Sequence, residues 1–198
     1  HLVDISTSLS TSNNINDIID YYAKKIKGVK FDSSQEALIF DKIIKGEALI
    51  VLGIIDNFVD NARRYNADIV IKTSKEDQWI KVEVPDTGPG ISSDRLQKLF
   101  NKHFTTKKFG EGGKGLYLTL EYLKLKGGRI QVDTKTDNND TLRLTFDDKL
   151  EKKTISPSDR TITGTTFTIW LPLSQKGIEQ SQSALREIVE GIAARNSI

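Results

Sequence analysis

Residues 49–65 constrain the fold most, because their pattern is typical of a single helix with two chemically different faces. At about 3.6 residues per turn, the apolar residues of this stretch gather on one side, namely Leu52, Ile55, Val59 and Ala62. Polar groups gather roughly opposite, on Asn57, Asn61, Arg64 and Tyr65. Asparagine is a poor residue for a helix interior, because its side chain competes for backbone groups. Two asparagines one turn apart beside an arginine therefore indicate a polar function, with a solvated face as the alternative.

Composition limits the classes of protein to consider. The 198 residues, 37% of them hydrophobic and 28% charged, are typical of one soluble domain with room for an appended helix or linker. No apolar run approaches the roughly 18 residues of a membrane span, so we expect no membrane segment. A formal charge of +2 is too small to indicate nucleic-acid binding. The absence of cysteine excludes disulfides in this chain and fits a reducing compartment, so a cytoplasmic location is expected.

A glycine-containing turn follows the next pair of predicted strands. Residues 67–73 and 78–84 alternate between apolar and polar side chains, which predicts an antiparallel hairpin around the polar turn 74–77. The second strand leads into Asp86, Gly88 and Gly90. A carboxylate at a strand end followed by two glycines predicts a tight turn in which the backbone can approach a ligand. Taken alone, this pattern is also typical of a plain turn.

Residues 102–115 form a second glycine-rich segment, with four glycines, four lysines and no periodicity. Glycines let amides turn toward an anion and lysines supply charge, so the segment is predicted to be a mobile, phosphate-binding loop. A disordered surface loop is the alternative. A dinucleotide-binding motif is disfavoured because no strand precedes the glycines, and a P-loop because no Ser or Thr follows Lys114. His103 has no acidic or cysteine partners nearby in the sequence, so we expect a structural or surface residue and not a metal ligand or a base.

The remaining segments complete a predicted two-layer arrangement. We expect helices at 15–26, 94–100, 116–126 and 185–194, strands at 29–31, 37–40, 129–134, 141–146 and 164–173, and an exposed loop or hairpin at 147–160. Helices packed on one face of a mixed, mostly antiparallel sheet make a two-layer α/β sandwich.

Six motifs occur in an order that resembles the GHKL ATPase superfamily, and most closely the ATP-binding catalytic domain of histidine kinases. They are DNFVDNARRY, DTGPG, FTTK, GGKGLYL, GGRI and GTTFTIWLPL, and they lie between residues 37 and 173. The resemblance implies a Bergerat-type α/β sandwich that binds ATP under a mobile lid. It also implies an ATP-binding domain at 37–175, preceded by a helical or linker segment at 1–36 and followed by a tail helix at 176–198.

The resemblance assigns roles to the polar face of the first helix. Asn61 matches the asparagine that ligates Mg²⁺, and Asn57 matches the accompanying polar position one turn earlier. Arg64 matches the basic position that meets the phosphates, and Tyr65 matches the residue that packs near adenine. An asparagine carbonyl oxygen suits Mg²⁺, which prefers oxygen ligands and shares them with phosphates and water.

The glycine-rich segments receive roles in the same way. Asp86 resembles the aspartate that accepts the adenine amino hydrogen, with Gly88 and Gly90 giving the base room to approach. The lid contacts are Thr105, Thr106 and Lys107, and the second glycine box is Gly113, Lys114, Gly115 and Leu116. Tyr117 departs from the family pattern, which has a glycine at that position.

The position four residues before the Mg²⁺ asparagine separates the branches of the superfamily. Chaperone and mismatch-repair members carry a glutamate there that activates water, whereas this chain has Asn57, which cannot act as a general base. Asp56 and Asp60 flank the site, but their angles on the helix make them weaker candidates for a general base. The resemblance therefore predicts a kinase that passes the γ-phosphoryl group to a histidine, by positioning and charge neutralisation.

No H-E-x-x-x-P phosphoacceptor box is present, since His1 lacks its Glu and Pro, so the acceptor histidine is expected outside these residues. Expected partners are ATP and a protein phosphoacceptor or response partner, with a dimer formed through the N-terminus or segments outside the chain. Residues 133–163 are longer than is usual in kinase domains and are a candidate docking surface. A nucleotide-sensing binding module and a slow stand-alone ATPase remain open as alternatives.

Overall fold

The computed structural model describes residues 15–33, 45–77, 79–102, 104 and 114–172. Their seven strands form one mixed sheet in the order β1-β2-β3-β7-β4-β5-β6. The strands are β1 (Val29–Ser33), β2 (Ile69–Glu76), β3 (Trp79–Pro85), β4 (Arg129–Lys135), β5 (Thr141–Phe146), β6 (Lys153–Pro157) and β7 (Gly164–Pro172). Only the pair β1 and β2 is parallel among the described strands.

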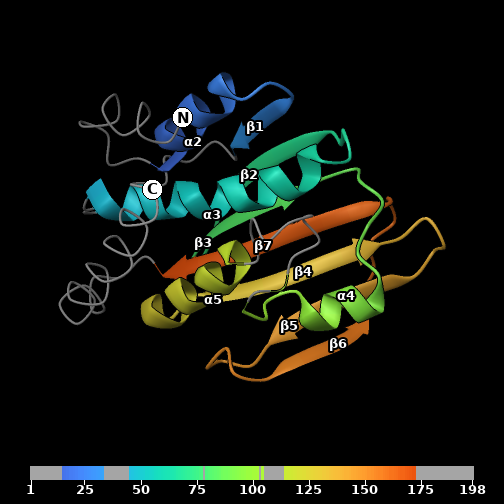
Figure 1. Cartoon of the computed structure of the whole chain (residues 1–198). Coiled ribbons are helices and arrows are strands. Elements are labelled where there is room, and N and C mark those ends of the chain that lie inside the picture. The colour runs from blue at the N-terminus through green and yellow to red at the C-terminus, as the bar shows by residue number, and fades with distance from the viewer. Residues whose placement is uncertain (1–14, 34–44, 78, 103, 105–113, 173–198) are drawn as a thin grey trace, which may run out of the picture.

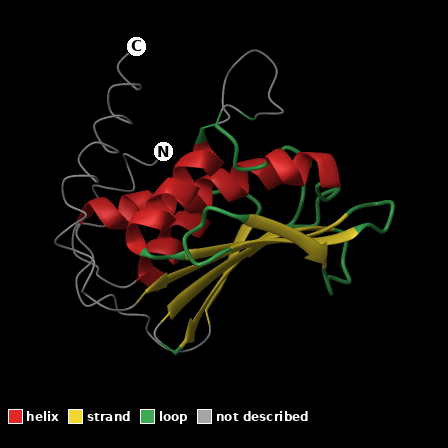
Figure 2. Cartoon of the chain, turned by 90° about the horizontal axis from the view of Figure 1, so that it is seen from below, coloured by secondary structure: helices red, strands yellow, loops and turns green. Residues whose placement is uncertain are grey.

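The described helices all pack on one face of this sheet, as Figures 1 and 2 show. They are α2 (Ile15–Lys25), α3 (Lys45–Arg63), α4 (Ser93–Lys98) and α5 (Gly115–Lys126). The predicted two-layer α/β sandwich with a mixed, mostly antiparallel sheet is confirmed. Among the residues that the structure describes, no helix is both long and apolar enough to cross a membrane.

The core lies between the two layers and follows the two sequence periodicities. The apolar side of α3 is buried as predicted, with Leu52, Ile55 and Val59 fully covered. Alternate residues of the strands meet it, because successive side chains of a strand point to opposite faces. Phe58 of α3 stacks on Phe167 of the central strand β7, with ring centroids 4.5 Å apart. This contact fixes the height of α3 above the sheet, and so places its polar face.

The predicted boundaries of the strand at 67–73 and of the helix at 94–100 differ from those in the structure. Residues 74–76 belong to β2, opposite residues 79–81, and the turn begins at Asp77, whose φ is 51°. Glu76 pairs with Lys81 and accepts a hydrogen bond from Trp170, so its polarity reflects an exposed strand end. The helix predicted at 94–100 is α4, Ser93–Lys98, because the Leu99 amide bonds to the Leu96 carbonyl and tightens the last turn.

Other expectations held. The hairpin alternative for residues 147–160 is confirmed, because β6 pairs antiparallel with β5. Helix α5 ends at Lys126, as predicted, and Gly127 follows it in the left-handed conformation with φ of 63°. The predicted strand at 37–40 and helix at 185–194 lie outside the described residues.

The described residues before position 34 share the sheet and core of those that follow. β1 hydrogen-bonds to β2, and Ile15, Ile18, Ile19 and Tyr22 of α2 are buried in the common core. The division at residue 36 remains a prediction.

Candidate functional site

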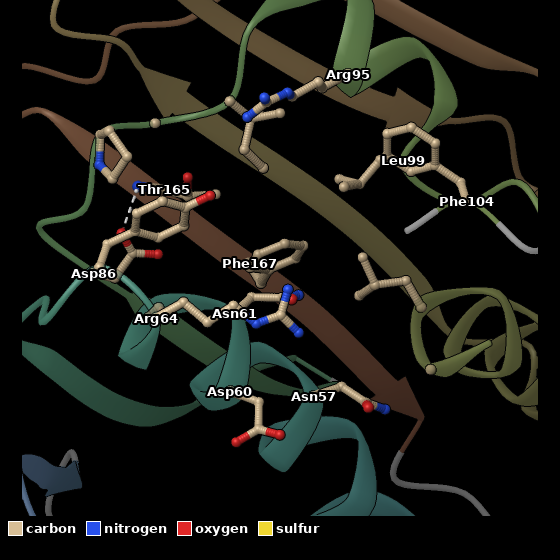
Figure 3. A pocket seen from close by; sticks show the side chains of 17 residues that line it. Asn57, Asp60, Asn61, Arg64, Asp86, Arg95, Leu99, Phe104, Thr165 and Phe167 are labelled. Carbon is tan, nitrogen blue, oxygen red and sulfur yellow. Dashed lines mark hydrogen bonds between the residues drawn. The ribbon is translucent and has the colours of Figure 1, made fainter. Parts of the chain in front are cut away.

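A cavity lies between α3, the turn after β3, α4 and the start of α5, above β7 (Figure 3). Its lining combines amides, charges and apolar side chains. The lining residues are Asn57, Asp60, Asn61, Ala62, Arg64, Tyr65, Asp86, Pro89, Gly90, Ile91, Arg95, Leu99, Phe104, Gly115, Leu116, Thr165 and Phe167.

The polar face of α3 forms one side of this cavity. Asn57, Asn61, Arg64 and Tyr65 all line it, so the helix does not simply present a solvated face. The two asparagines are half-buried, while Arg64 and Tyr65 lie exposed at the rim. The opposite side of α3 is fully packed, and the helix therefore cannot rotate to turn these groups away.

Asp86, after β3, also lines the cavity, and hydrogen bonds to backbone groups fix its position. Its Oδ1 accepts hydrogen bonds from the amides of Gly88, at 2.8 Å, and Thr165, at 3.2 Å. Its own amide donates to the Thr165 carbonyl at 2.8 Å. No described residue donates a hydrogen bond to Oδ2, so this oxygen is available to a ligand in the cavity.

The two predicted glycines shape the turn around Asp86 in different ways. A Cβ on Gly88 would lie 2.9 Å from Asp86 Oδ1, so a side chain would press on the carboxylate. Gly90 has φ of 76°, and a Cβ there would lie 2.3 Å from the Lys135 carbonyl oxygen. The next amide, of Ile91, donates to Thr134 Oγ1 at 2.7 Å. The turn is therefore locked onto β4. Gly90 lines the cavity, whereas buried Gly88 acts through Asp86.

The environment of Asp86 changes the pKa of its carboxyl group. Burial raises the pKa of its carboxyl, against the opposing influence of the Gly88 and Thr165 amides and of the nearby Arg160 guanidinium. The carboxylate therefore takes up a proton at a higher pH than an exposed aspartate does.

The start of α5 forms the far side of the cavity. A Cβ on Gly115 would lie 2.3 Å from Asn57 Oδ1, so the lack of a side chain lets the helix start reach α3. The residue at the N-cap, Lys114, makes no side-chain cap to the first amides, and the first turn holds no acidic residue. A helix start of this kind carries partial positive charge and free N–H groups, which suit phosphate. Leu116 lines the cavity, while Lys114 is exposed and does not.

Four predicted contacts, at Thr105, Thr106, Lys107 and Gly113, lie outside the described residues. Tyr117, the departure from the family pattern, lies half-buried on α5 with Lys102 Nζ 5.8 Å from its ring centroid.

Two acidic residues flank Asn57 on α3 and differ in their surroundings. Asp56 accepts a 2.6 Å hydrogen bond from the Tyr22 hydroxyl of α2 and does not line the cavity. Burial raises the pKa values of both Asp56 and Tyr22. Asp60 is exposed and lines the cavity.

Sequence reasoning missed several lining residues. Phe167 and Thr165 belong to a strand that was predicted, but their position over the cavity depends on β7 lying at the centre of the sheet. Arg95 of α4 reaches the cavity from the opposite side to α3, and no local pattern marks it (Figure 3).

Comparison with known proteins agrees with this geometry. The family profile described as "Histidine kinase-, DNA gyrase B-, and HSP90-like ATPase" matches residues 46–175. The chain belongs to this family. It thus contains an ATP-binding, kinase-type catalytic domain of the GHKL superfamily, as the motif order predicted.

Curated relatives are sensor kinases. The sensor protein ChvG of Agrobacterium fabrum is 27% identical over 145 residues, which is 69% of this chain and 23% of ChvG. The histidine-protein kinase ArlS of Staphylococcus epidermidis is 31% identical over 97 residues, which is 45% of this chain and 21% of ArlS. The chain thus spans under a quarter of the length of these relatives.

Solved structures share the fold. The mycobacterial sensor histidine kinase MprB gives a TM-score of 0.53 at 16% identity, covering 80% of this chain and 93% of MprB. The catalytic domain of the histidine kinase ThkA gives 0.52 at 18% identity, covering 85% of this chain and 90% of that domain.

Proposed function

We propose that this GHKL domain binds ATP with Mg²⁺ and transfers the γ-phosphoryl group to a histidine that lies outside these 198 residues. The observation that carries the proposal is that one cavity brings together Asp86, the polar face of α3 and the start of α5. Asp86 offers an acceptor, while Asn61, Arg64 and the α5 amides offer groups that suit phosphate.

The two ends of the cavity fit the two ends of ATP. Asp86 Oδ2 would accept a hydrogen bond from the adenine amino group, and Tyr65 at the rim would pack near the base. Phe167 and Leu99 supply apolar lining for a planar ring. Arg64 would pair with the phosphates, and the first amides of α5 would cradle them.

The donor set fits Mg²⁺ carried by the nucleotide. Mg²⁺ keeps several waters and is typically held by one or two protein oxygens together with substrate phosphates. Asn61 places one amide group at the cavity, and the described residues contain no cluster of three or more His, Asp or Glu suited to hold a metal alone. Bound there through Asn61, the ion would neutralise charge on the phosphates during transfer.

The transfer itself requires positioning rather than a base on this chain. An imidazole nitrogen of the acceptor forms a bond to the γ-phosphorus, the bond to the β–γ bridging oxygen breaks, ADP leaves and the imidazole proton passes to solvent. Arg64 and the α5 amides would stabilise the charge that develops on the phosphate oxygens. Asn57 has no basic group with which to activate water, which favours transfer over hydrolysis.

The partner of this reaction is proposed to be a histidine-bearing protein segment, because sensor kinases are the relatives that the chain matches. Residues 133–163 remain the candidate docking surface. Their strand β6 is one of the two edge strands of the described sheet, and a partner could reach it there. A dimer through the N-terminus or outside segments likewise stays a prediction.

Calorimetric titration with ATP and Mg²⁺ tests binding, using the wild-type chain beside Asp86→Ala and Asn61→Ala. We expect micromolar-range binding that either substitution weakens by at least about tenfold, equivalent to about 1.4 kcal/mol. The same samples are then incubated with γ-labelled ATP and a histidine-containing segment of the parent protein.

Label that is acid-labile and base-stable on the added segment supports the proposal, because phosphohistidine has this stability. Steady phosphate release without labelled protein would instead favour a stand-alone ATPase, with Asp60 as its candidate base. Binding with neither transfer nor release would favour a nucleotide sensor. Absence of ATP binding to the wild type would refute all three readings.

A further inference from the structure

Arg160, between β6 and β7, joins the extended region 133–163 to the Asp86 site. Its Nη2 donates a 2.7 Å hydrogen bond to the main-chain carbonyl of Asp86, which lies 74 residues earlier in the chain. Its Nη1 donates to the hydroxyl of Thr166 on β7. The guanidinium thus contacts the backbone of the residue whose carboxylate faces the cavity.

The segment that carries Arg160 is itself anchored to the sheet. Asp133 of β4, only 8% exposed, accepts hydrogen bonds from Arg143 Nε at 2.6 Å and from Ser158 Oγ at 2.7 Å. Arg143 also pairs with Asp159 at 2.6 Å. The residues on the N-terminal side of Arg160 are therefore tied to β4 and β5, and its side chain leaves from a fixed point.

The backbone at Asp86 is shaped to receive this side chain. Gly164 has φ of 123°, and a Cβ there would lie 2.0 Å from the Asp86 carbonyl oxygen and 3.0 Å from Arg160 Nη2. With Arg160 in place, the amide, carbonyl and Oδ1 of Asp86 all have hydrogen-bond partners. Only Oδ2 is left for a ligand.

A contribution to the stability of the fold is a poor explanation for the position of Arg160. Arg160 Nε is buried and has no hydrogen-bond partner among the described residues. Its two other contacts are to neutral oxygens. The guanidinium lies near the Asp86 and Asp133 carboxylates but hydrogen-bonds to neither, and partial burial of a charge with one donor unsatisfied costs free energy.

We infer that Arg160 is a positioning residue for base recognition: by holding the Asp86 carbonyl, it orients the carboxylate that accepts the amino group of the purine. The inference rests on the proposed function of Asp86. It gives the 133–163 region a part in nucleotide selection, because Arg160 holds the Asp86 backbone by a hydrogen bond and its positive charge lies near the Asp86 carboxylate.

The preference for ATP over inosine triphosphate measures this role, because the inosine base has no amino group to donate to Asp86. Calorimetric affinities for both nucleotides are measured on the whole chain with Arg160→Met, which keeps side-chain length and removes every donor. Lys152→Ala is the matched control, since it removes one exposed positive charge from the same region without contact to Asp86. Arg160→Lys restores a donor.

We expect the wild type and Lys152→Ala to prefer ATP by about tenfold, which corresponds to one hydrogen bond to a charged acceptor. Arg160→Met should reduce this preference to less than about threefold, and Arg160→Lys should recover part of it. If a melting curve shows that methionine disrupts the native fold, Arg160→Ala is measured instead, with the same expected loss.

The inference is overturned if Arg160→Met prefers ATP over inosine triphosphate as strongly as the wild type does. This includes the case in which the loss of charge lowers both affinities by the same factor. Failure of the proposed function looks different: the wild type would not bind ATP, or Asp86→Asn would leave its preference unchanged.

Discussion

Two glycines in helices, Gly53 and Gly115, provide a matched test of how closely α5 approaches α3. A Cβ at Gly53, inside α3, would meet no atom within 4 Å. A Cβ at Gly115, the first residue of α5, would lie 2.3 Å from Asn57 Oδ1 and 2.7 Å from its Cγ. The same substitution, glycine to alanine, thus adds a methyl group to open space in one case and to an occupied contact in the other.

The two substitutions should have different effects on stability. Alanine is favoured over glycine inside a helix by about 0.5–1 kcal/mol, so Gly53→Ala should raise the free energy of unfolding by that amount. Gly115→Ala can raise the free energy of unfolding by no more than the same amount. Overpacking of the new methyl group against Asn57 lowers it by about 1–3 kcal/mol. We therefore expect the Gly115 variant to be less stable than the Gly53 variant by about 1–3 kcal/mol.

Nucleotide affinity should separate the variants further. Gly53 does not line the cavity, so Gly53→Ala should bind ATP like the wild type. The methyl group at Gly115 must displace the Asn57 amide or the start of α5, both of which line the cavity, and about a tenfold or greater loss of affinity is expected.

Urea unfolding followed by fluorescence of the two tryptophans, both in the sheet, gives the stabilities, and calorimetry gives the affinities. If Gly115→Ala were as stable as Gly53→Ala and bound ATP normally, the approach of α5 to Asn57 described here would be wrong.

Further predictions concern buried polar groups. Thr134→Val removes a fully buried hydroxyl that bonds two backbone groups, so urea unfolding should show a loss of about 2–4 kcal/mol, while a loss below about 0.5 kcal/mol would contradict these bonds. Tyr22→Phe leaves Asp56 without its donor and should cost about 1–3 kcal/mol at neutral pH. Asp56→Asn keeps an acceptor and removes a charge that burial disfavours, so it should cost less than Tyr22→Phe, and the reverse order would refute this account. Because burial raises the pKa of Asp86 above 3.8, ATP affinity should be constant above that raised pKa and fall as pH drops through it. Calorimetry from about pH 7 down to about pH 3.5, below the ordinary pKa of an aspartate, checks this, with Asp86→Asn expected to be weak and flat; a wild-type affinity that stays flat over the whole range would exclude an ionised Asp86 from binding.

Local patterns were sufficient for most of the elements. The apolar stripe of α3, the alternation in β2 and β3, and the end of α5 at residue 126 depend on residues within a few positions of each other, and each was predicted. The polar face of α3 and the glycine turn after β3 were also identified as the binding groups to examine, because asparagine and glycine are unusual in those positions unless the backbone or a ligand requires them.

Polarity by itself could not place the end of β2. Exposed strand ends and turns both carry charged residues, and only the pairing of Glu76 with Lys81 and its hydrogen bond from Trp170 distinguish them.

Sequence by itself therefore determined the layers of this protein and the chemical character of its cavity, since periodicity and motif chemistry are properties of short segments. The tertiary structure alone decided that Asp86, Thr165 and Arg160 share one set of hydrogen bonds, with Phe167 beneath the cavity. These groups lie far apart in the chain and meet only because β7 inserts between β3 and β4. Such long-range strand order depends on the packing of the whole sheet, which no local pattern encodes.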